Sequence, residues 1–337
     1  MSDRPIAAII GVGGLALTDD EIALLRARPP TGAILFGRNV RDPAQLSVLT
    51  TALRAALPPE AVLMVDQEGG RVARLRPPHW RAHPPAGRIG EVFAADPAVG
   101  RRVAWLTGAL IGLDCAAMGF DVVCAPVLDL RFPGAHDVIG DRAFAGSPDA
   151  VADLGRAMAA GLLAAGVQPV AKHAPGHGRA RADSHLSLPV VETGDLADDL
   201  APFARNADLP WMMTSHLLYR AVDPDRPASQ SARVIEALIR GRIGFAGVLA
   251  SDDLAMQALS GPPEARALGA LAAGCDLALY CPGDGPDTAA VLRRCPPLTD
   301  AALARLAAAR SLARDRRLAL DAAALDAERS GLLSCSM

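Results

Sequence analysis

The sequence predicts an α/β protein built as a single (β/α)8 barrel of the TIM type. Short apolar runs alternate with helical patterns along the chain, and we count eight such runs. Continuous apolar strands that alternate with helices are typical of a parallel sheet covered by helices, and eight of them can close a barrel. A doubly wound open sheet is the structural alternative. The expected strands are Ala7 to Gly11, Ala33 to Phe36, Ala61 to Val65, Phe120 to Val127, Pro169 to Ala171, Pro210 to Met213, Ala246 to Ala250 and Asp276 to Tyr280.

The segments between most of these strands carry helical patterns, for example residues 44–57 and 148–165. No linker rich in Pro or Ser divides the 337 residues, and a hydrophobic content of 51% is ample for one large core. Since α/β barrels routinely exceed the average domain length, we expect a single catalytic domain over residues 1–337. The Ala-rich, helical segment from about residue 300 to 337 should pack on it.

Composition and charge exclude several classes of protein. A net charge of −3 and a pI near 6.2 argue against a nucleic-acid or anionic-membrane surface. No apolar run reaches the length of about 18 residues that a membrane span needs. The apolar N-terminal stretch runs into Asp19, Asp20 and Glu21 without a cleavage-like ending, so it does not resemble a signal peptide. Six cysteines without a CxxC pair indicate reduced thiols, and we expect a cytoplasmic protein.

Polar residues fall where several of the expected strands end. Asp66 follows Val62 to Val65, Lys172 and His173 follow Pro169 to Ala171, and Asp252 follows the run that ends at Ala250. In a parallel barrel these strand ends share one rim, where barrel active sites lie. Asp66 and Asp252 could therefore meet in one pocket, which predicts an enzyme.

The densest polar stretch is Lys172 to His185, which holds one lysine, three histidines and an aspartate. If the end of this stretch is extended, Asp183 and His185 point the same way and can meet. A carboxylate beside an imidazole favours its protonated form, as a general acid/base needs, although a structural Asp–His contact is the plainer alternative. The glycines at 176 and 178 suggest a mobile loop that could close over a substrate.

Other interpretations of individual motifs are weaker. His173 and His177 have a metal-like spacing, but Pro175 and Gly176 separate them and no third ligand is evident, so we expect no metal. Residues 11–16 resemble a dinucleotide loop but lack the acidic residue after the next strand, so we expect no cofactor. Asp252 and its neighbour could simply cap a helix. For Glu68, the preferred interpretation is a turn with a solvated ion pair.

Several long motifs occur in order between about residues 34 and 283, and through them the chain resembles the family-three glycoside hydrolases. The resemblance is to their single-domain bacterial β-N-acetylglucosaminidases (β-hexosaminidases) of peptidoglycan recycling. The motifs are ILFGRNV at 34–40, DQEGGRVARL at 66–75, APVLDL at 125–130, VIGDRAF at 138–144, KHAPGHG with DSH within 172–185, MTSH at 213–216 and SDDLAM at 251–256.

The resemblance implies a retaining, two-step hydrolysis of terminal N-acetylglucosamine from muropeptides or similar chitooligosaccharides. Asp252 takes the position of the nucleophile, which would form a covalent glycosyl-enzyme. His185 takes the position of the acid/base, with Asp183 as its dyad partner. The family positions that hold the sugar are occupied here by Asp66, Arg74, Arg142, Lys172 and His173.

Three functions stay open on the sequence alone. The first is this hydrolase, and the second is a phosphorylase, or a broader β-glycosidase, that uses the same site. A histidine acid/base, unlike a carboxylate, would not repel an incoming phosphate. The third is a sugar-binding barrel without activity, which the set of Asp252, His185 and Asp183 argues against. We expect a monomer or weak homodimer with no nucleic-acid or membrane partner.

Overall fold

A computed structural model describes residues 4–180, 182–184 and 186–334, and its centre is a closed barrel of eight parallel strands. The strands follow the order β1-β10-β9-β7-β5-β4-β3-β2, and each pairs in parallel with its neighbours. This confirms the predicted (β/α)8 barrel, with one strand at each expected run, and excludes the open sheet. The barrel strands are β1 (Ile6–Gly11), β2 (Pro30–Leu35), β3 (Val62–Val65), β4 (Val122–Val123), β5 (Gln168–Ala174), β7 (Trp211–Thr214), β9 (Val248–Asp253) and β10 (Leu277–Tyr280).

Three of these strands end three or more residues away from the predicted end. β4 is shorter than the expected run because Pro126 has no backbone N–H to donate to a regular ladder. β5 and β9 are longer, and they take Lys172 and His173, and Asp252, into the ends of the strands. A separate two-stranded sheet of β6 (Val190–Val191) and β8 (Leu218–Tyr219) was not expected.

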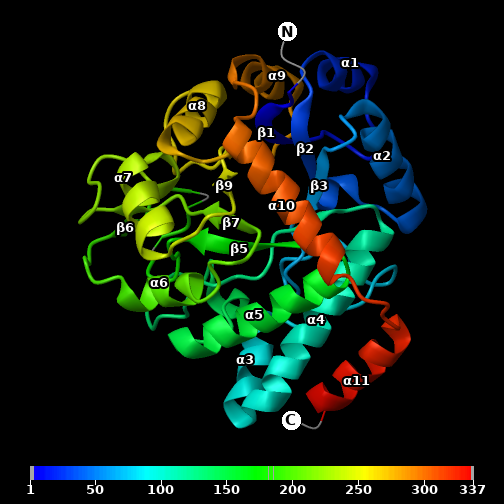
Figure 1. The fold of residues 1–337 in the computed structure, drawn as a ribbon, viewed down its shortest axis with the longest axis vertical. Helices are drawn as coiled ribbons and strands as arrows, with labels where there is room; N and C mark the ends of the chain where they lie inside the picture. Colours follow the sequence, from blue (N-terminus) through cyan, green and yellow to red (C-terminus); the bar gives the residue numbers. More distant parts are fainter. Residues whose placement is uncertain (1–3, 181, 185, 335–337) are drawn as a thin grey trace.

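Helices surround the barrel in Figure 1. The helical patterns at residues 44–57 and 148–165 correspond to α2 and α5. Most begin with a side-chain cap, such as Thr18 in a capping box at α1 and Asp96 at α4. The helices are α1 (Asp19–Ala27), α2 (Pro43–Ala56), α3 (Ala86–Ala95), α4 (Pro97–Ala117), α5 (Pro148–Ala164), α6 (Ala197–Ala204), α7 (Ala232–Val234, continued by a π-helical segment, Ile235–Arg242), α8 (Pro263–Ala273), α9 (Gly285–Arg294), α10 (Asp300–Arg316) and α11 (Ala322–Ser334).

The apolar side chains form two clusters, one on each face of the barrel wall. Along β1, Ala7 and Ile9 belong to the cluster inside the barrel, whereas Ala8 and Ile10 belong to the cluster between the barrel and the helices. This alternation follows from the two-residue period of a strand. The inside of the barrel is therefore a packed core.

Helix α10 closes the amino-terminal end of the barrel, and it crosses the face of the molecule seen in Figure 1. Ala302, Leu306 and Ala309 of this helix belong to the same buried cluster as the barrel interior. Helix α11 then packs along α4, where Arg102 pairs with Glu328 at 2.7 Å. The carboxyl-terminal rim of the strands is thus the end left for a site.

Two further features concern the whole of the described chain. No helix in residues 4–180, 182–184 and 186–334 is both long and apolar enough to cross a membrane. The five cysteines in this part of the chain are buried free thiols, and Cys335 lies outside it.

Asp276 ties α10 to the barrel, and replacing it tests this connection. Its carboxylate accepts from Arg305 of α10 at 2.6 Å, from Arg240 at 3.1 Å and from the Leu249 amide at 2.9 Å. Because Asp276→Ala leaves these donors without their acceptor in a buried place, we expect a loss of about 3 kcal/mol in the free energy of unfolding, measured by urea denaturation. The control is Asp300→Ala, also on α10 but with an 88% exposed side chain, which should change stability by less than about 0.5 kcal/mol. Equal stabilities of the two variants would contradict this role.

Candidate active site

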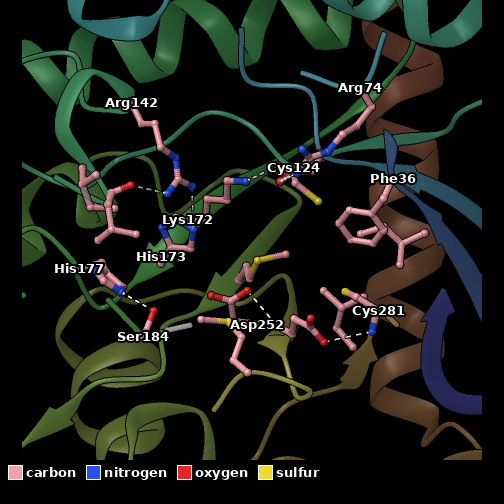
Figure 2. A pocket seen from close by; sticks show the side chains of 18 residues that line it. Phe36, Arg74, Cys124, Arg142, Lys172, His173, His177, Ser184, Asp252 and Cys281 are labelled. Atoms are coloured by element: carbon pink, nitrogen blue, oxygen red, sulfur yellow. Dashed lines mark hydrogen bonds and ion pairs between the residues drawn. The ribbon is translucent and has the colours of Figure 1, made fainter. Parts of the chain in front are cut away.

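A polar cavity opens at the carboxyl-terminal rim of the barrel, and Figure 2 shows the side chains that line it. Its empty volume is about 670 Å³, open solvent at the mouth included. The side chains come from the ends of several strands, as expected for a barrel site. The structure brings together all five predicted sugar-binding residues and the predicted nucleophile. The lining residues are Ile34, Phe36, Asp66, Arg74, Cys124, Val138, Ile139, Arg142, Lys172, His173, His177, Ser184, Met213, Asp252, Asp253, Met256, Leu279 and Cys281.

Lys172 lies between two carboxylates at the back of this cavity. Its ammonium nitrogen is 2.6 Å from Asp66 Oδ1 and 2.6 Å from Glu68 Oε1. Burial alone would lower the pKa of Lys172, but Asp66 and Glu68 raise it above its ordinary value. The other oxygen of Asp66 accepts from Arg74 Nη2 at 2.8 Å, and the Arg74 guanidinium lies 5.4 Å from the centre of the Phe36 ring. Lys172, near the end of β5, is therefore held as a cation by two carboxylates that follow β3.

Glu68 corrects one prediction, because it is not part of a solvated turn. The residue is buried, and its carboxylate accepts two hydrogen bonds from Arg142, at 2.9 Å from Nε and 2.8 Å from Nη2. Burial alone would raise the pKa of Glu68, but Lys172 and Arg142 lower it well below its usual range. The partners of Glu68 are distant in the sequence, which is why local turn chemistry suggested solvent instead.

Asp129 is a site residue that the sequence reasoning did not single out. It is fully buried and accepts from the Nδ1 of His173 at 2.6 Å and from the backbone amide of His177 at 2.6 Å. Burial alone would raise the pKa of Asp129, but the His173 ring and these donors lower it. Because an ionised carboxylate only accepts, His173 Nδ1 carries a proton, which leaves its Nε2 facing Arg142 Nη2 at 3.4 Å. The available signal was the position of Asp129 just beyond the fourth strand.

Asp252 lies at the end of β9 and faces Lys172 and His173 across the cavity (Figure 2). It is not a helix cap, since α8 begins only at Pro263. Within the described chain its carboxylate accepts one hydrogen bond, from the Asp253 amide at 2.8 Å to Oδ1. Burial alone would raise the pKa of Asp252, but the hydrogen bond from this amide and the charge of Lys172 help to lower it. An ionised oxygen, Oδ2, therefore remains available to a ligand.

His216 supports the backbone beside Asp252. Its Nε2 lies 2.9 Å from the Asp253 carbonyl oxygen, so this nitrogen must donate, and Nδ1 then accepts from the Ser229 hydroxyl at 2.7 Å. Burial lowers the pKa of His216. The ring is thus neutral, has one tautomer, and holds the end of β9 in place.

The segment that follows β5 carries the predicted dyad. Asp183 is partly buried, and Ser184 lines the cavity, where its hydroxyl oxygen is 3.0 Å from His177 Nε2 (Figure 2). His185, the predicted acid/base, lies outside the described residues. Two positions of this segment require glycine. Gly176 has a φ of +136°, which favours glycine, and Gly178 lies so close to the Leu130 carbonyl that a side chain would not fit.

The cavity combines many hydrogen-bonding groups with nearly balanced charge. The network contains three cations and three carboxylates, so its own charge is close to neutral. The cations are Lys172, Arg74 and Arg142, and the carboxylates are Asp66, Glu68 and Asp129. Such a lining suits a neutral ligand with many hydroxyl groups, against which the carboxylate of Asp252 is the free anion. In the described residues no group of three or more His, Cys, Asp or Glu side chains could hold a metal ion.

The fold and the cavity define a TIM-barrel enzyme with a carboxylate presented to a polar ligand at its carboxyl-terminal rim. Comparison with known proteins makes this more specific. Residues 9–295 match the glycosyl hydrolase family 3 N-terminal domain, and the chain belongs to this family.

Curated relatives and solved structures agree with the family. A β-hexosaminidase of Alkalilimnicola ehrlichii is 43% identical over 309 residues, covering 88% of this chain and 87% of that protein. A β-hexosaminidase of Bordetella avium is 40% identical over 306 residues, with coverage of 88% and 87%. The crystal structure of NagZ from Neisseria gonorrhoeae with N-trifluoroacetyl-D-glucosamine superposes with a TM-score of 0.86, at 31% identity and 98% coverage of both chains.

The buried ring of His177 should make stability depend on pH. Burial lowers its pKa from 6.5 to about 4. Between these values the unfolded chain binds the proton and the folded chain does not, so stability is lost as pH falls. Between pH 7 and pH 5, the free energy of unfolding of His177→Gln should therefore fall by about 2 kcal/mol less than that of the wild type, measured by urea unfolding. His79→Gln, at an exposed histidine, should keep the wild-type dependence, and an unchanged slope in His177→Gln would refute the assignment.

Proposed function

We propose that the protein is a retaining exo-β-N-acetylglucosaminidase that removes terminal N-acetylglucosamine from muropeptides or related chitooligosaccharides. The broader assignment, a glycosidase of the β-hexosaminidase class, follows from the family and from relatives of that name. The observation that carries the proposal is the ionised, partly exposed carboxylate of Asp252 in a polar cavity of nearly balanced charge.

The sugar would bind between the charged network and Asp252. The carboxylate oxygens of Asp66 would accept hydrogen bonds from sugar hydroxyls. Lys172, Arg74 and Arg142 would donate hydrogen bonds to hydroxyl oxygens. His173 is oriented by Asp129, and its Nε2 faces Arg142 within the same cavity. Lining residues such as Met213, Met256 and Leu279 supply the apolar surface against the ring.

Asp252 would act as the nucleophile of a two-step reaction. One carboxylate oxygen is held by the Asp253 amide, so the other attacks the anomeric carbon while the bond to the leaving oxygen breaks. The product of this step is a glycosyl ester of Asp252 and a free aglycone. Water then attacks the same carbon, releases the sugar with net retention and restores the carboxylate.

His185, with Asp183 as its partner, would supply the proton to the leaving oxygen and take one from the water. The support is positional: Ser184, which lies between them in the sequence, lines the cavity. An imidazole with an ordinary pKa near 6.5 can give and take a proton near neutral pH.

We further infer one catalytic domain over the whole chain, because α10 completes the barrel core and α11 packs on α4. We also infer a cytoplasmic protein, which the free buried thiols of the described chain support, and a monomer or weak homodimer.

Removal of the nucleophile tests the proposal directly. Asp252→Ala should lower kcat on p-nitrophenyl β-N-acetylglucosaminide by ~10⁴-fold or more, with an unchanged melting curve. The matched control is Asp253→Asn, since Asp253 Oδ1 accepts from the Ala255 and Cys281 amides and an amide oxygen can replace it. That variant should stay within about tenfold of the wild type. Near-normal turnover by Asp252→Ala would refute the assignment of Asp252 as the nucleophile. If the wild type preferred the matching glucoside, the assignment of N-acetylglucosamine as the sugar would be wrong.

Replacement of the acid/base should depend on the leaving group. His185→Ala should lower kcat/KM for chitobiose by about 10²- to 10⁴-fold, because this alkoxide leaves poorly without a proton. The p-nitrophenyl substrate, whose phenolate leaves unaided, should lose much less in kcat/KM. Equal losses on both substrates would mean that His185 positions the sugar and donates no proton.

A further inference from the structure

The segment after β5 is fixed on two sides before it reaches the dyad. The Tyr219 hydroxyl donates to the Gly176 carbonyl, and the His136 amide donates to the Ala180 carbonyl at 2.8 Å. Gly178 lies so close to the Leu130 carbonyl that no Cβ would fit there. Residues 176–180 are therefore held in one backbone path.

Within residues 176–180, Arg179 forms an ion pair with Asp199. Its Nε donates to Asp199 Oδ2 at 2.7 Å, and its guanidinium lies 4.2 Å from the centre of the Phe132 ring. The Asp199 side chain is only 3% exposed, whereas that of Arg179 is 30% exposed. In the described chain Arg179 is the only cation paired with Asp199, so the pair connects this segment to the first turn of α6.

The geometry of Asp199 explains why this contact should be strong. Burial raises the pKa of Asp199, while the hydrogen bond and charge of Arg179 oppose this rise. A buried carboxylate needs a hydrogen-bonded counter-charge, and here the planar guanidinium also stacks on an aromatic ring. Lysine offers the charge without the planar stack.

The two ends of the segment are also joined to each other. His177 Nε2 lies 3.0 Å from the Ser184 hydroxyl, and the Ala258 amide donates to the Ser184 carbonyl at 3.3 Å. A shift of residues 176–180 would therefore be passed through His177 to Ser184, which lies between the two members of the proposed dyad.

We propose that Arg179 is a positioning residue: by pairing with buried Asp199 and lying over the Phe132 ring, it fixes residues 176–180 and, through the contact of His177 with Ser184, the part of the chain that carries the proposed dyad. This inference rests on the proposed function, because it assigns the dyad to the same segment. Arg179 is not among the lining residues of the sugar cavity, and its side chain lines a separate pocket together with Phe132.

The test compares Arg179→Ala, Arg179→Lys and a matched control, Arg220→Ala. Arg220 forms an exposed ion pair with Glu192 at 3.1 Å, beside the same part of the fold. Arg179→Ala should lower kcat/KM for chitobiose by about 10- to 100-fold, since a misplaced proton donor loses much of its effect. For the p-nitrophenyl substrate, kcat/KM should change by less than about threefold. Arg179→Lys should recover part of the loss on chitobiose. Arg220→Ala should match the wild type on both substrates.

Amide hydrogen exchange of the same proteins provides a second, independent measurement. Residues 176–180 should exchange faster in Arg179→Ala than in Arg220→Ala or the wild type. Unchanged exchange, or the same loss on both substrates, would overturn the positioning role. If His185→Ala itself shows no dependence on the leaving group, the proposed function fails, and the exchange rates alone then decide whether Arg179 anchors the segment.

Discussion

The cavity depends on one ammonium group held between two carboxylates. Lys172 lies 2.6 Å from both Asp66 and Glu68, and each carboxylate binds a further arginine, Arg74 or Arg142. An isolated buried charge would be strongly unfavourable, so each of these groups is stable only because the next one is present. The network holds its donors and acceptors in fixed positions before any ligand binds, which reduces the ordering cost of binding.

The sequence predicted the strands and the rim residues because both follow from local patterns. Continuous apolar runs predict buried parallel strands, and a polar residue directly after such a run lies at the rim, as Asp66 and Asp252 do. Glu68 and Asp129 depend instead on partners far away in the chain. Glu68 lies in a turn of ordinary composition, and only the approach of Arg142 and Lys172 reveals that it is buried. The resemblance to known glycosidases contributed the roles of individual residues, which spacing alone did not provide.

The two ends of the barrel contribute differently to the protein. At the amino-terminal end, α10 inserts Ala302, Leu306 and Ala309 into the apolar core, and Asp276 ties the helix to the sheet. At the carboxyl-terminal end, the strands end in charged and polar side chains whose geometry the packed core below holds in place. Substitutions at the first end should act on stability, and those at the second end on ligand binding and chemistry.

The packed core of the barrel also limits how a ligand can reach the site. Because side chains fill the barrel below the cavity, a substrate would enter, and both products would leave, at the carboxyl-terminal rim. In a reaction with a covalent intermediate, the aglycone occupies the place that the attacking water needs, and it must depart first. The sugar held by the proposed ester would leave last. A cavity closed at its base would favour the proposed cleavage at a chain terminus, because an internal sugar unit could not pass through it.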